Sequence, residues 1–281
     1  MYGTPGKLSA TRSFLRSNRA RIVIALILIV AVQFYAVFQI VNSYRREQRI
    51  VQEIRAVRGT VGFKYFGSIW FPDVFRRLFN RVDSISLHRS TISTELLQSL
   101  RSLKYLETLE LRETQVTGAG VEQLRGMTSL RFLDFDNTEI GDAELEHLRG
   151  LKSLESLHLS ATRVGDAGLG HLRGLTNLRY LKLNHTRVTD AGLKYLNELP
   201  MLEGIELIRT NITDAGIEEL KRLTNLKTLL IDRTNVSDAG LRRLKTFSSL
   251  RYLWVDEKKT SAEGRVALKQ ALPDCRIRYG P

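Results

Sequence analysis

The sequence predicts an α/β solenoid, built from repeated strand–helix units and preceded by one transmembrane helix. The first observation behind this prediction is a threonine that returns at a constant interval, at Thr114, Thr138, Thr162, Thr186, Thr210 and Thr234. The second is a long uncharged run upstream of the repeats, at positions 22–41. A fixed repeat of this length is typical of a solenoid, because a single unit cannot bury its apolar face alone and stacks on its neighbours.

An apolar frame surrounds each threonine. The leucines that open the frame are Leu106, Leu130, Leu154, Leu178, Leu202, Leu226 and Leu250. One full interval before the first complete unit, the frame falls on Val82, Ile85, Leu87 and Ile92. We therefore count seven 24-residue repeats over residues 82–249, followed by a C-terminal cap over residues 250–281.

Each unit combines two kinds of apolar spacing. In the fullest copy, LRYLKLNHTRVTDAGLKYLNEL, apolar residues alternate over residues 179–183, which is the period of a half-buried strand. Leu193, Leu196 and Leu199 then follow at helical spacing. The aspartates just before the helical runs are expected to cap them by accepting from free N–H groups, and they are Asp142, Asp166, Asp190, Asp214 and Asp238. The threonines are expected to hydrogen-bond the backbone of the next coil, since a stacked interior leaves turn amides in need of partners.

The pattern L-x-x-L-x-L-x-x-T-x-V-T-D-A-G-L resembles the leucine-rich repeat, and in particular a bacterial, planctomycete-like type whose units carry a V-T-D-A-G-L turn. The likeness extends over about residues 82–279. It implies a leucine-rich repeat solenoid with a concave parallel β-sheet and convex helices. The position that holds threonine here is usually asparagine in that family.

The segment before the repeats begins with a basic tail, residues 1–21, which has five basic residues and no acidic one. Residues 22–41 are long enough to cross the hydrocarbon core of a bilayer as a helix. A buried core helix is disfavoured, because a solenoid has no place for a helix that is apolar all round. A cleaved signal peptide is disfavoured too, since VNSYRREQR follows without an A-x-A-like site. We expect an uncleaved signal anchor, single-pass in the cytoplasmic membrane.

The charges that flank this span indicate its orientation in the membrane only weakly. Five basic residues precede it and five follow it, so the positive-inside count is a tie. The short tail without acids favours a cytoplasmic N-terminus. We therefore expect the repeat domain on the outer, periplasmic side.

Two further segments separate the span from the repeats. Residues 42–60 predict a juxtamembrane amphipathic helix that Gly59 ends, with an apolar stripe made of Ile50, Val51, Ile54 and Val57. This stripe would lie on the bilayer, pack on the first cap or pair two chains. Residues 61–81 predict an N-terminal cap with a short helix that begins near Pro72. Their aromatic cluster is alternatively a partner site.

The excess of positive charge lies close to the expected membrane. Of the net charge of +13, residues 82–281 contribute only +2. Such a distribution suits attraction to anionic lipid headgroups and gives no reason to expect nucleic-acid binding by the repeats. The chain has one cysteine, Cys275, which excludes an intrachain disulfide and is expected to pack as a small apolar side chain.

The sequence contains no signature of catalysis. G-x-S-x-G, P-loop and H-E-x-x-H patterns are all missing. The five histidines fall in different units, and we expect His147 and His171, at equivalent helix positions one coil apart, to be solvated and not metal ligands. The sequence therefore predicts a protein that is not an enzyme and that has no cofactor and no metal site.

The variable residues of the strands are expected to point into the concave face. Tyr180, Leu230, Tyr252 and Trp254 are apolar groups, partly of the types enriched at interaction hot spots, while Glu110, Asp134 and Asp136 form an acidic patch. The candidate binding residues are Phe132, Asp134, Asp136, His158, Tyr180, Lys182, Glu206, Leu230, Tyr252 and Trp254. Variation from unit to unit also describes an unconstrained surface, so both interpretations stay open.

These observations favour a membrane-anchored protein that binds a protein or peptide ligand through its concave face. The first alternative is a structural spacer of the cell envelope without a discrete ligand. The second is an F-box-like adaptor, which would need a separate helical module that residues 42–81 are too short to supply. The sequence identifies neither the ligand nor the oligomeric state.

Overall fold

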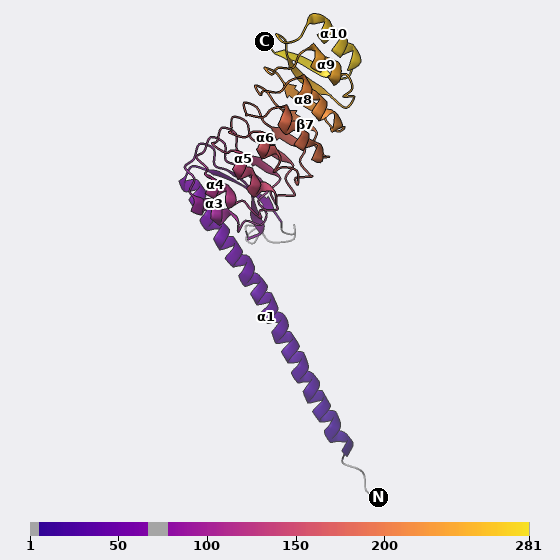
Figure 1. Cartoon of the computed structure of the whole chain (residues 1–281). Coiled ribbons are helices and arrows are strands. Elements are labelled where there is room, and N and C mark those ends of the chain that lie inside the picture. The colour runs from indigo at the N-terminus through magenta and orange to yellow at the C-terminus, as the bar shows by residue number, and fades with distance from the viewer. Residues whose placement is uncertain (1–5, 67–77, 281) are drawn as a thin grey trace.

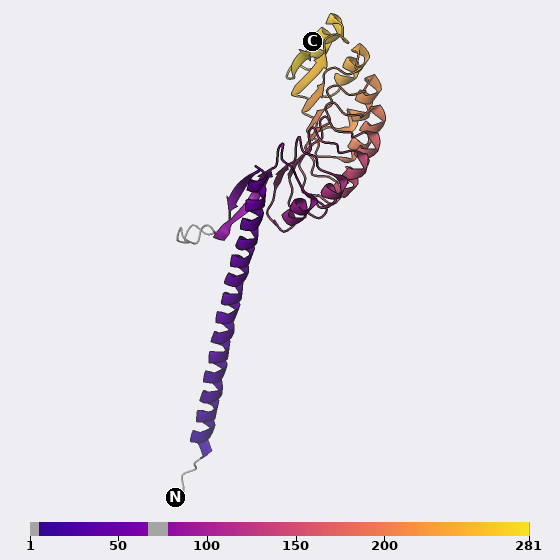
Figure 2. The same cartoon turned by 90° about the vertical axis from the view of Figure 1, so that its left-hand side faces the viewer.

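The computed structural model describes residues 6–66 and 78–280. A long N-terminal helix leads into a curved stack of coils, with the strands on the inner side of the curve and short helices on the outer side (Figures 1 and 2). The predicted α/β solenoid with one apolar N-terminal helix is thus confirmed.

The ten strands of the described residues form one sheet in the order of the chain. Neighbouring strands are parallel except for the first pair, which is antiparallel. The strands are β1 Thr60–Tyr65, β2 Asn80–Ser86, β3 Thr108–Glu110, β4 Phe132–Asp134, β5 Ser156–His158, β6 Tyr180–Lys182, β7 Gly204–Glu206, β8 Thr228–Ile231, β9 Tyr252–Asp256 and β10 Arg276–Gly280. Because each register step from β2 to β9 equals one repeat, every column of the sequence becomes a row across the sheet.

The helices of the coils are short, and several continue as 3₁₀ turns. They are α3 Thr94–Leu100, α4 Gly118–Glu122, α5 Asp142–Leu145 with η1 Glu146–Leu148, α6 Asp166–Leu169, α7 Asp190–Leu193 with η2 Lys194–Glu198, α8 Asp214–Glu219 with η3 Leu220–Arg222, α9 Asp238–Leu244 and α10 Ala262–Ala271. The long N-terminal helix is α1 Gly6–Ala56. A coil as short as one repeat leaves room for only one or two turns of helix beside its strand and turns.

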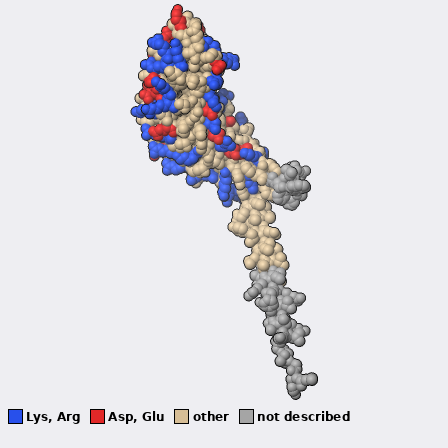
Figure 3. Space-filling view, turned by 90° about the vertical axis from the view of Figure 1, so that its right-hand side faces the viewer, with Lys and Arg blue, Asp and Glu red and all other residues tan. Residues whose placement is uncertain are grey.

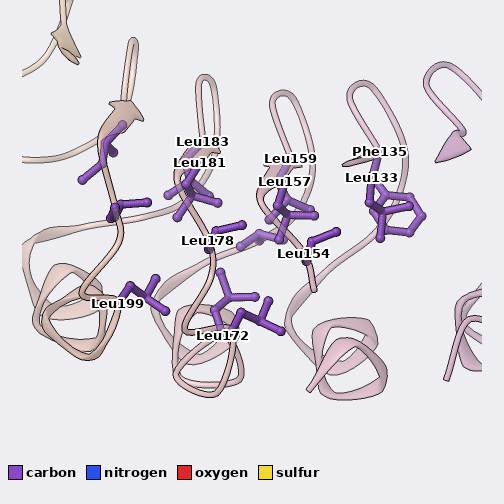
Figure 4. Close-up of a cluster of buried hydrophobic side chains, with 14 of the residues drawn as sticks. Leu133, Phe135, Leu154, Leu157, Leu159, Leu172, Leu178, Leu181, Leu183 and Leu199 are labelled. Atoms are coloured by element: carbon purple, nitrogen blue, oxygen red, sulfur yellow. The ribbon is translucent and has the colours of Figure 1, made fainter. Parts of the chain in front are cut away.

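The leucine columns fill the space between the strands and the helices. Leu133, Leu157 and Leu181 lie side by side on successive strands, and all are at most 1 % exposed (Figure 4). Phe135 occupies a leucine position in the same interior and is fully buried. Each such side chain contributes roughly 1.5–3 kcal/mol through burial. Because one apolar core joins all the coils, a coil is stable only when its neighbours are present.

The repeated threonines bond within their own coil, so the expected bond to the next coil was wrong. The hydroxyl of Thr114 donates to the carbonyl of Leu111 at 2.5 Å, and that of Thr186 to Leu183 at 2.7 Å. The residue before each threonine, for example Glu113 at φ 56°, has a left-handed backbone. This turn brings the hydroxyl back to a carbonyl of its own strand end. The coils are joined at this level by backbone amides instead, such as Glu113 N–H to Asp136 O at 2.9 Å.

The repeated aspartates also act differently from the expected helix caps. The cap of α7 is Thr189, whose hydroxyl accepts from Ala191 N–H. Asp166 lies at the start of the preceding helix and accepts from both the N–H of Thr189, at 2.8 Å, and its hydroxyl, at 2.7 Å. A Cβ on Gly192 would lie 2.4 Å from the same carboxylate, so glycine is needed there. The aspartates therefore hold the cap of the next coil in place.

Asp214→Ala is expected to lower the free energy of unfolding by about 2 kcal/mol, twice the effect of Asp142→Ala. Asp214 accepts three hydrogen bonds from the next coil, from Ser237 N–H and hydroxyl and from Gly240 N–H, whereas Asp142 accepts one, from Gly165 N–H. Urea unfolding followed by circular dichroism measures the difference. Equal losses in the two variants would contradict a role in joining coils.

The end of α1 packs on the first coil. Ile50, Val51 and Ile54 are at most 4 % exposed and belong to the common core, so of the three expectations for this stripe the packing one is correct. The helix does not end through a left-handed Gly59. Arg58 takes that conformation, at φ 62°, and Gly59 N–H closes the end on Ile54 O at 2.8 Å.

The first coil is closed by an unforeseen strand, β1, which pairs antiparallel with β2. The helix expected near Pro72 lies almost entirely outside the described residues. At the other end, α10 and β10 follow the last repeat, within the residues expected as the C-terminal cap. Cys275 is 2 % exposed, as expected, and its burial raises the pKa of the thiol.

Candidate functional site

The candidate residues form two adjacent rows across the concave sheet. The strand register places Asp134, His158, Lys182, Glu206, Leu230 and Trp254 beside one another in chain order. A second row holds Phe132, Tyr180 and Tyr252, with Ser156, Gly204 and Thr228 between them. The fold therefore brings nine of the ten candidates onto these two rows, and Asp136 lies directly beyond the end of β4.

At the N-terminal end of the rows, Asp134 and His158 bind each other. His158 Nδ1 lies 3.6 Å from Asp134 Oδ2, and its Nε2 lies 3.3 Å from the hydroxyl of Ser156. Phe132 packs edge-on against the imidazole, with 4.7 Å between the ring centroids. These contacts fix the orientation of the His158 ring from within the protein.

The acidic patch expected around Asp134 is consequently not an open surface. Asp134 is 6 % exposed; burial disfavours its charge, but bonds from His158 and from Asp136 N–H outweigh this, so the pKa of Asp134 lies below its ordinary value. Burial and the neighbouring Asp134 charge raise the pKa of Asp136, which accepts from Ser160 N–H at 2.6 Å. Both carboxylates already have protein partners, so they attract a basic ligand group less than an open patch would.

The middle of the rows is polar and hollowed. Lys182 Nζ lies 3.7 Å from Glu206 Oε1, and the amide of Asn184 donates to Glu206 Oε2 at 2.6 Å. These three residues, together with Asp136 and Ser160, line an open pocket of about 400 Å³. Asn184 was not among the candidate residues, although in the alternating pattern of its unit it lies two residues after Lys182, on the same side of the strand.

The C-terminal part of the rows is apolar. Tyr180 is 49 % exposed, while Leu230, Tyr252 and Trp254 are half-buried, less open than the sequence suggested. A Cβ on Gly204 would lie 2.8 Å from the Tyr180 ring, so the missing side chain of Gly204 lets that ring lie across β7 toward β8. The signal for Gly204 was present in the sequence, because no other unit has glycine at that position. The arrangement offers a ligand an apolar surface beside a polar pocket.

Two buried carboxyl groups, those of Asp232 and Asp256, lie at the C-terminal end of the sheet. Asp232 is 3 % exposed, Asp256 is 8 % exposed, and Asp232 Oδ1 has no hydrogen-bond partner among the described residues. Arg233 Nε lies 3.7 Å from the other oxygen of Asp232. Burial, and next the charge of Asp256, raise the pKa of Asp232.

Asp232→Asn is therefore expected to stabilise the protein at pH 7 by about 1 kcal/mol. With a raised folded-state pKa, the native protein holds this proton more tightly than the unfolded chain, so stability falls as pH rises from the unfolded pKa through the folded one. The gain should disappear below about pH 4, where the carboxyl is protonated in both states. Thermal unfolding at the two pH values checks this, with exposed Asp274→Asn as the neutral control. A gain that is the same at both pH values would contradict it.

The described residues contain one group that could hold a metal ion, formed by Asp134, Asp136 and His158, whose ligand atoms all lie within 4.8 Å of one another. The register of β4 and β5 places Asp134 beside His158, and Asp136 follows on the same side of its segment, so the fold itself brings these side chains together. On the convex side, the Nδ1 atoms of His147 and His171 do not face each other. They accept from Arg125 at 3.0 Å and from Arg149 at 2.6 Å, respectively.

Comparison with solved structures shows the same fold in other proteins. Internalin C2 from Listeria monocytogenes is 22 % identical to this chain; the match covers 71 % of this chain and 81 % of the internalin, with a TM-score of 0.59. A leucine-rich repeat protein from Leptospira interrogans is 21 % identical, with 64 % and 50 % covered and a TM-score of 0.50. This chain thus spans half of the Leptospira protein. The comparison with curated proteins gives no match.

The family comparison is decisive for the repeats. The model of the leucine-rich repeat region matches residues 82–278, which is most of the chain. It begins at the first buried apolar residue of β2 and ends within β10. The chain therefore belongs to the leucine-rich repeat proteins.

Proposed function

We propose that this protein is anchored in a membrane by α1 and binds a protein or peptide through the concave face of its repeats, without catalysis. The observation that supports binding is the partly exposed apolar surface formed by Tyr180, Leu230, Tyr252 and Trp254 beside a polar pocket. Aromatic side chains of this kind supply most of the energy at protein interfaces. The repeat sequence leads us to propose a bacterial, planctomycete-like protein.

The apolar part of α1 supports the anchor. Between Val23 and Phe38, the large apolar side chains that the structure describes are between 53 % and 74 % exposed, and no part of the most apolar stretch is buried against the rest of the protein. In Figure 3 it projects from the repeats as a tan rod without charged residues. An apolar surface of this length is stable only in a lipid environment or against a partner. The same helix continues without a break into the first coil, which favours an anchor over a cleaved signal sequence.

Proteolysis of intact spheroplasts tests the anchor and its orientation. With a cytoplasmic N-terminus and the repeats on the outer side, added protease is expected to digest residues 42–281 while leaving a short membrane-protected fragment. Permeabilised cells provide the control for protease activity. Full protection in intact cells would place the repeats inside, and recovery of the intact chain in the soluble fraction would refute the anchor.

The two alternatives predict other outcomes. A spacer without a ligand would tolerate changes on the concave face without losing any partner. An F-box-like adaptor would need a free helical module before the repeats. Residues 42–56 instead form the end of α1 and pack through Ile50, Val51 and Ile54 on the first coil, which weakens that alternative.

A further inference from the structure

A pocket lies between α1 and the first coil, where the apolar span ends. It measures about 320 Å³ and is lined by Gln39, Ile40, Asn42, Ser43, Arg46 and Glu47 of α1, by Ser102, Lys104 and Tyr105 of the first coil, and by Arg81. We define this as the neck pocket. No candidate residue of the concave face contributes to it, so the neck pocket is a separate site.

The neck pocket carries unpaired positive charge. Arg46 and Lys104 both line it, both are exposed, and neither side chain forms a hydrogen bond or ion pair with the described residues. Arg81 is neutralised, because its Nε lies 3.7 Å from Glu47 Oε1. The pocket therefore holds two cations that have no counterion among the described residues. Such a site is stabilised by a bound anion.

Neutral polar groups complete the lining. Asn42 offers an amide at the helix side of the pocket and Tyr105 a phenol at the coil side. The Tyr105 ring is held by Phe66, with 4.6 Å between centroids, and its hydroxyl has no hydrogen bond among the described residues. These groups suit a small anion that accepts several hydrogen bonds, such as a phosphodiester.

The depth of the pocket identifies the source of that anion. If the span ends at Val41, Arg46 lies about 7.5 Å further along the helix axis, at about 1.5 Å per residue. The headgroup layer extends roughly 5–7.5 Å beyond each side of the hydrocarbon core, so Arg46 would lie at its outer edge. Arg46 and the mouth of the neck pocket would thus lie at the level of the lipid phosphates. This step rests on the proposed membrane anchor.

We propose that the neck pocket binds the phosphate headgroup of an anionic phospholipid. The lipid would belong to the leaflet at which the apolar span of α1 ends, on the side of the repeats. The bound lipid would link the helix to the first coil and fix how the repeats stand on the membrane. Zwitterionic phosphatidylcholine fits less well, because its ammonium group would meet Arg46 and Lys104.

The full-length protein in detergent micelles tests this, with bound lipid counted by native mass spectrometry after addition of phosphatidylglycerol or phosphatidylcholine. Arg46→Gln with Lys104→Gln is expected to weaken phosphatidylglycerol binding about tenfold. The matched control is Arg45→Gln with Arg101→Gln, which removes two nearby exposed cations outside the pocket. It should weaken phosphatidylglycerol binding less than threefold. Arg46→Lys with Lys104→Arg should retain binding.

Equal losses in the two double variants would overturn the site, since they would indicate general attraction to the surface. Equal binding of phosphatidylcholine, or displacement of the lipid by an excess of inorganic phosphate, would overturn the lipid assignment. Flotation with phosphatidylcholine vesicles separates this proposal from the anchor. A chain that fails to float refutes both, whereas a chain that floats normally but shows no lipid preference refutes the neck pocket alone.

Discussion

Phe135→Ala is expected to lower the free energy of unfolding by about 3–5 kcal/mol, the largest effect of any single change considered for this protein. Phe135 is fully buried and lies between the strands and helices of its coil, next to Leu133 and Leu159 (Figure 4). Its removal leaves a cavity that the rigid stack cannot close, because each neighbouring coil is fixed by backbone bonds on its other side. Urea unfolding of the full-length protein measures the loss.

Phe135→Leu provides the matched control. Leucine occupies the same column in other units, at Leu111, Leu159 and Leu183, so the site accepts it with a smaller void. We expect the control to cost less than about 1.5 kcal/mol. A loss as large as that of the alanine variant would show that the aromatic ring is required, and a negligible loss in the alanine variant would show that the coil collapses around the site.

Tyr252→Ala combined with Trp254→Ala is expected to abolish capture of the protein partner by the tagged full-length chain. Both residues lie on β9, and their half-buried side chains form no hydrogen bond with the described residues, so their removal takes away apolar contact area and leaves the strand ladder intact. Truncation of a hot-spot aromatic residue of this type lowers the binding free energy by about 2 kcal/mol or more. For the pair, this corresponds to a roughly thousandfold loss of affinity. Affinity purification from detergent-solubilised membranes, with quantitative mass spectrometry, is the measurement.

The control for this experiment removes exposed apolar side chains elsewhere. Met201→Ala with Val266→Ala changes residues that are 46 % and 58 % exposed and lie outside the strands. This variant should capture the partner normally. Unchanged capture by the Tyr252 and Trp254 variant, with circular dichroism confirming that it is folded, would reject the apolar part of the concave face as the binding surface and favour the spacer alternative.

The core and the fold were predictable because they depend on local periodicity. The alternation around Leu181 and the helical spacing after Leu193 indicate which side of each segment is buried. Because the repeat length is constant, the apolar sides of all units are buried when the units stack on one another. The register of the sheet follows from the same repeat length. The residues of the concave rows were therefore assigned correctly in position, from Asp134 to Trp254.

What the sequence left open was the partner of each polar side chain. Thr186 and Asp166 recur with equal regularity, yet the threonine bonds inside its coil and the aspartate bonds to the next one. That difference depends on the direction of each side chain relative to the stacking axis, which a left-handed turn or a helix start sets in three dimensions. Asp134 likewise looked like part of an open patch until His158, one repeat further along the chain, was found within 3.6 Å.

By itself, the sequence determined that this chain is a stack of leucine-rich coils behind one apolar helix, since burial follows from spacing along the chain. Only the tertiary structure decided where α1 meets the repeats and which charges remain without a partner. It buried Ile50, Val51 and Ile54 on the first coil and left Arg46 and Lys104 in the neck pocket without a partner among the residues that the structure describes. The physical reason is that an ion pair or a pocket depends on distances between segments that are far apart in the chain, and no local pattern encodes those distances.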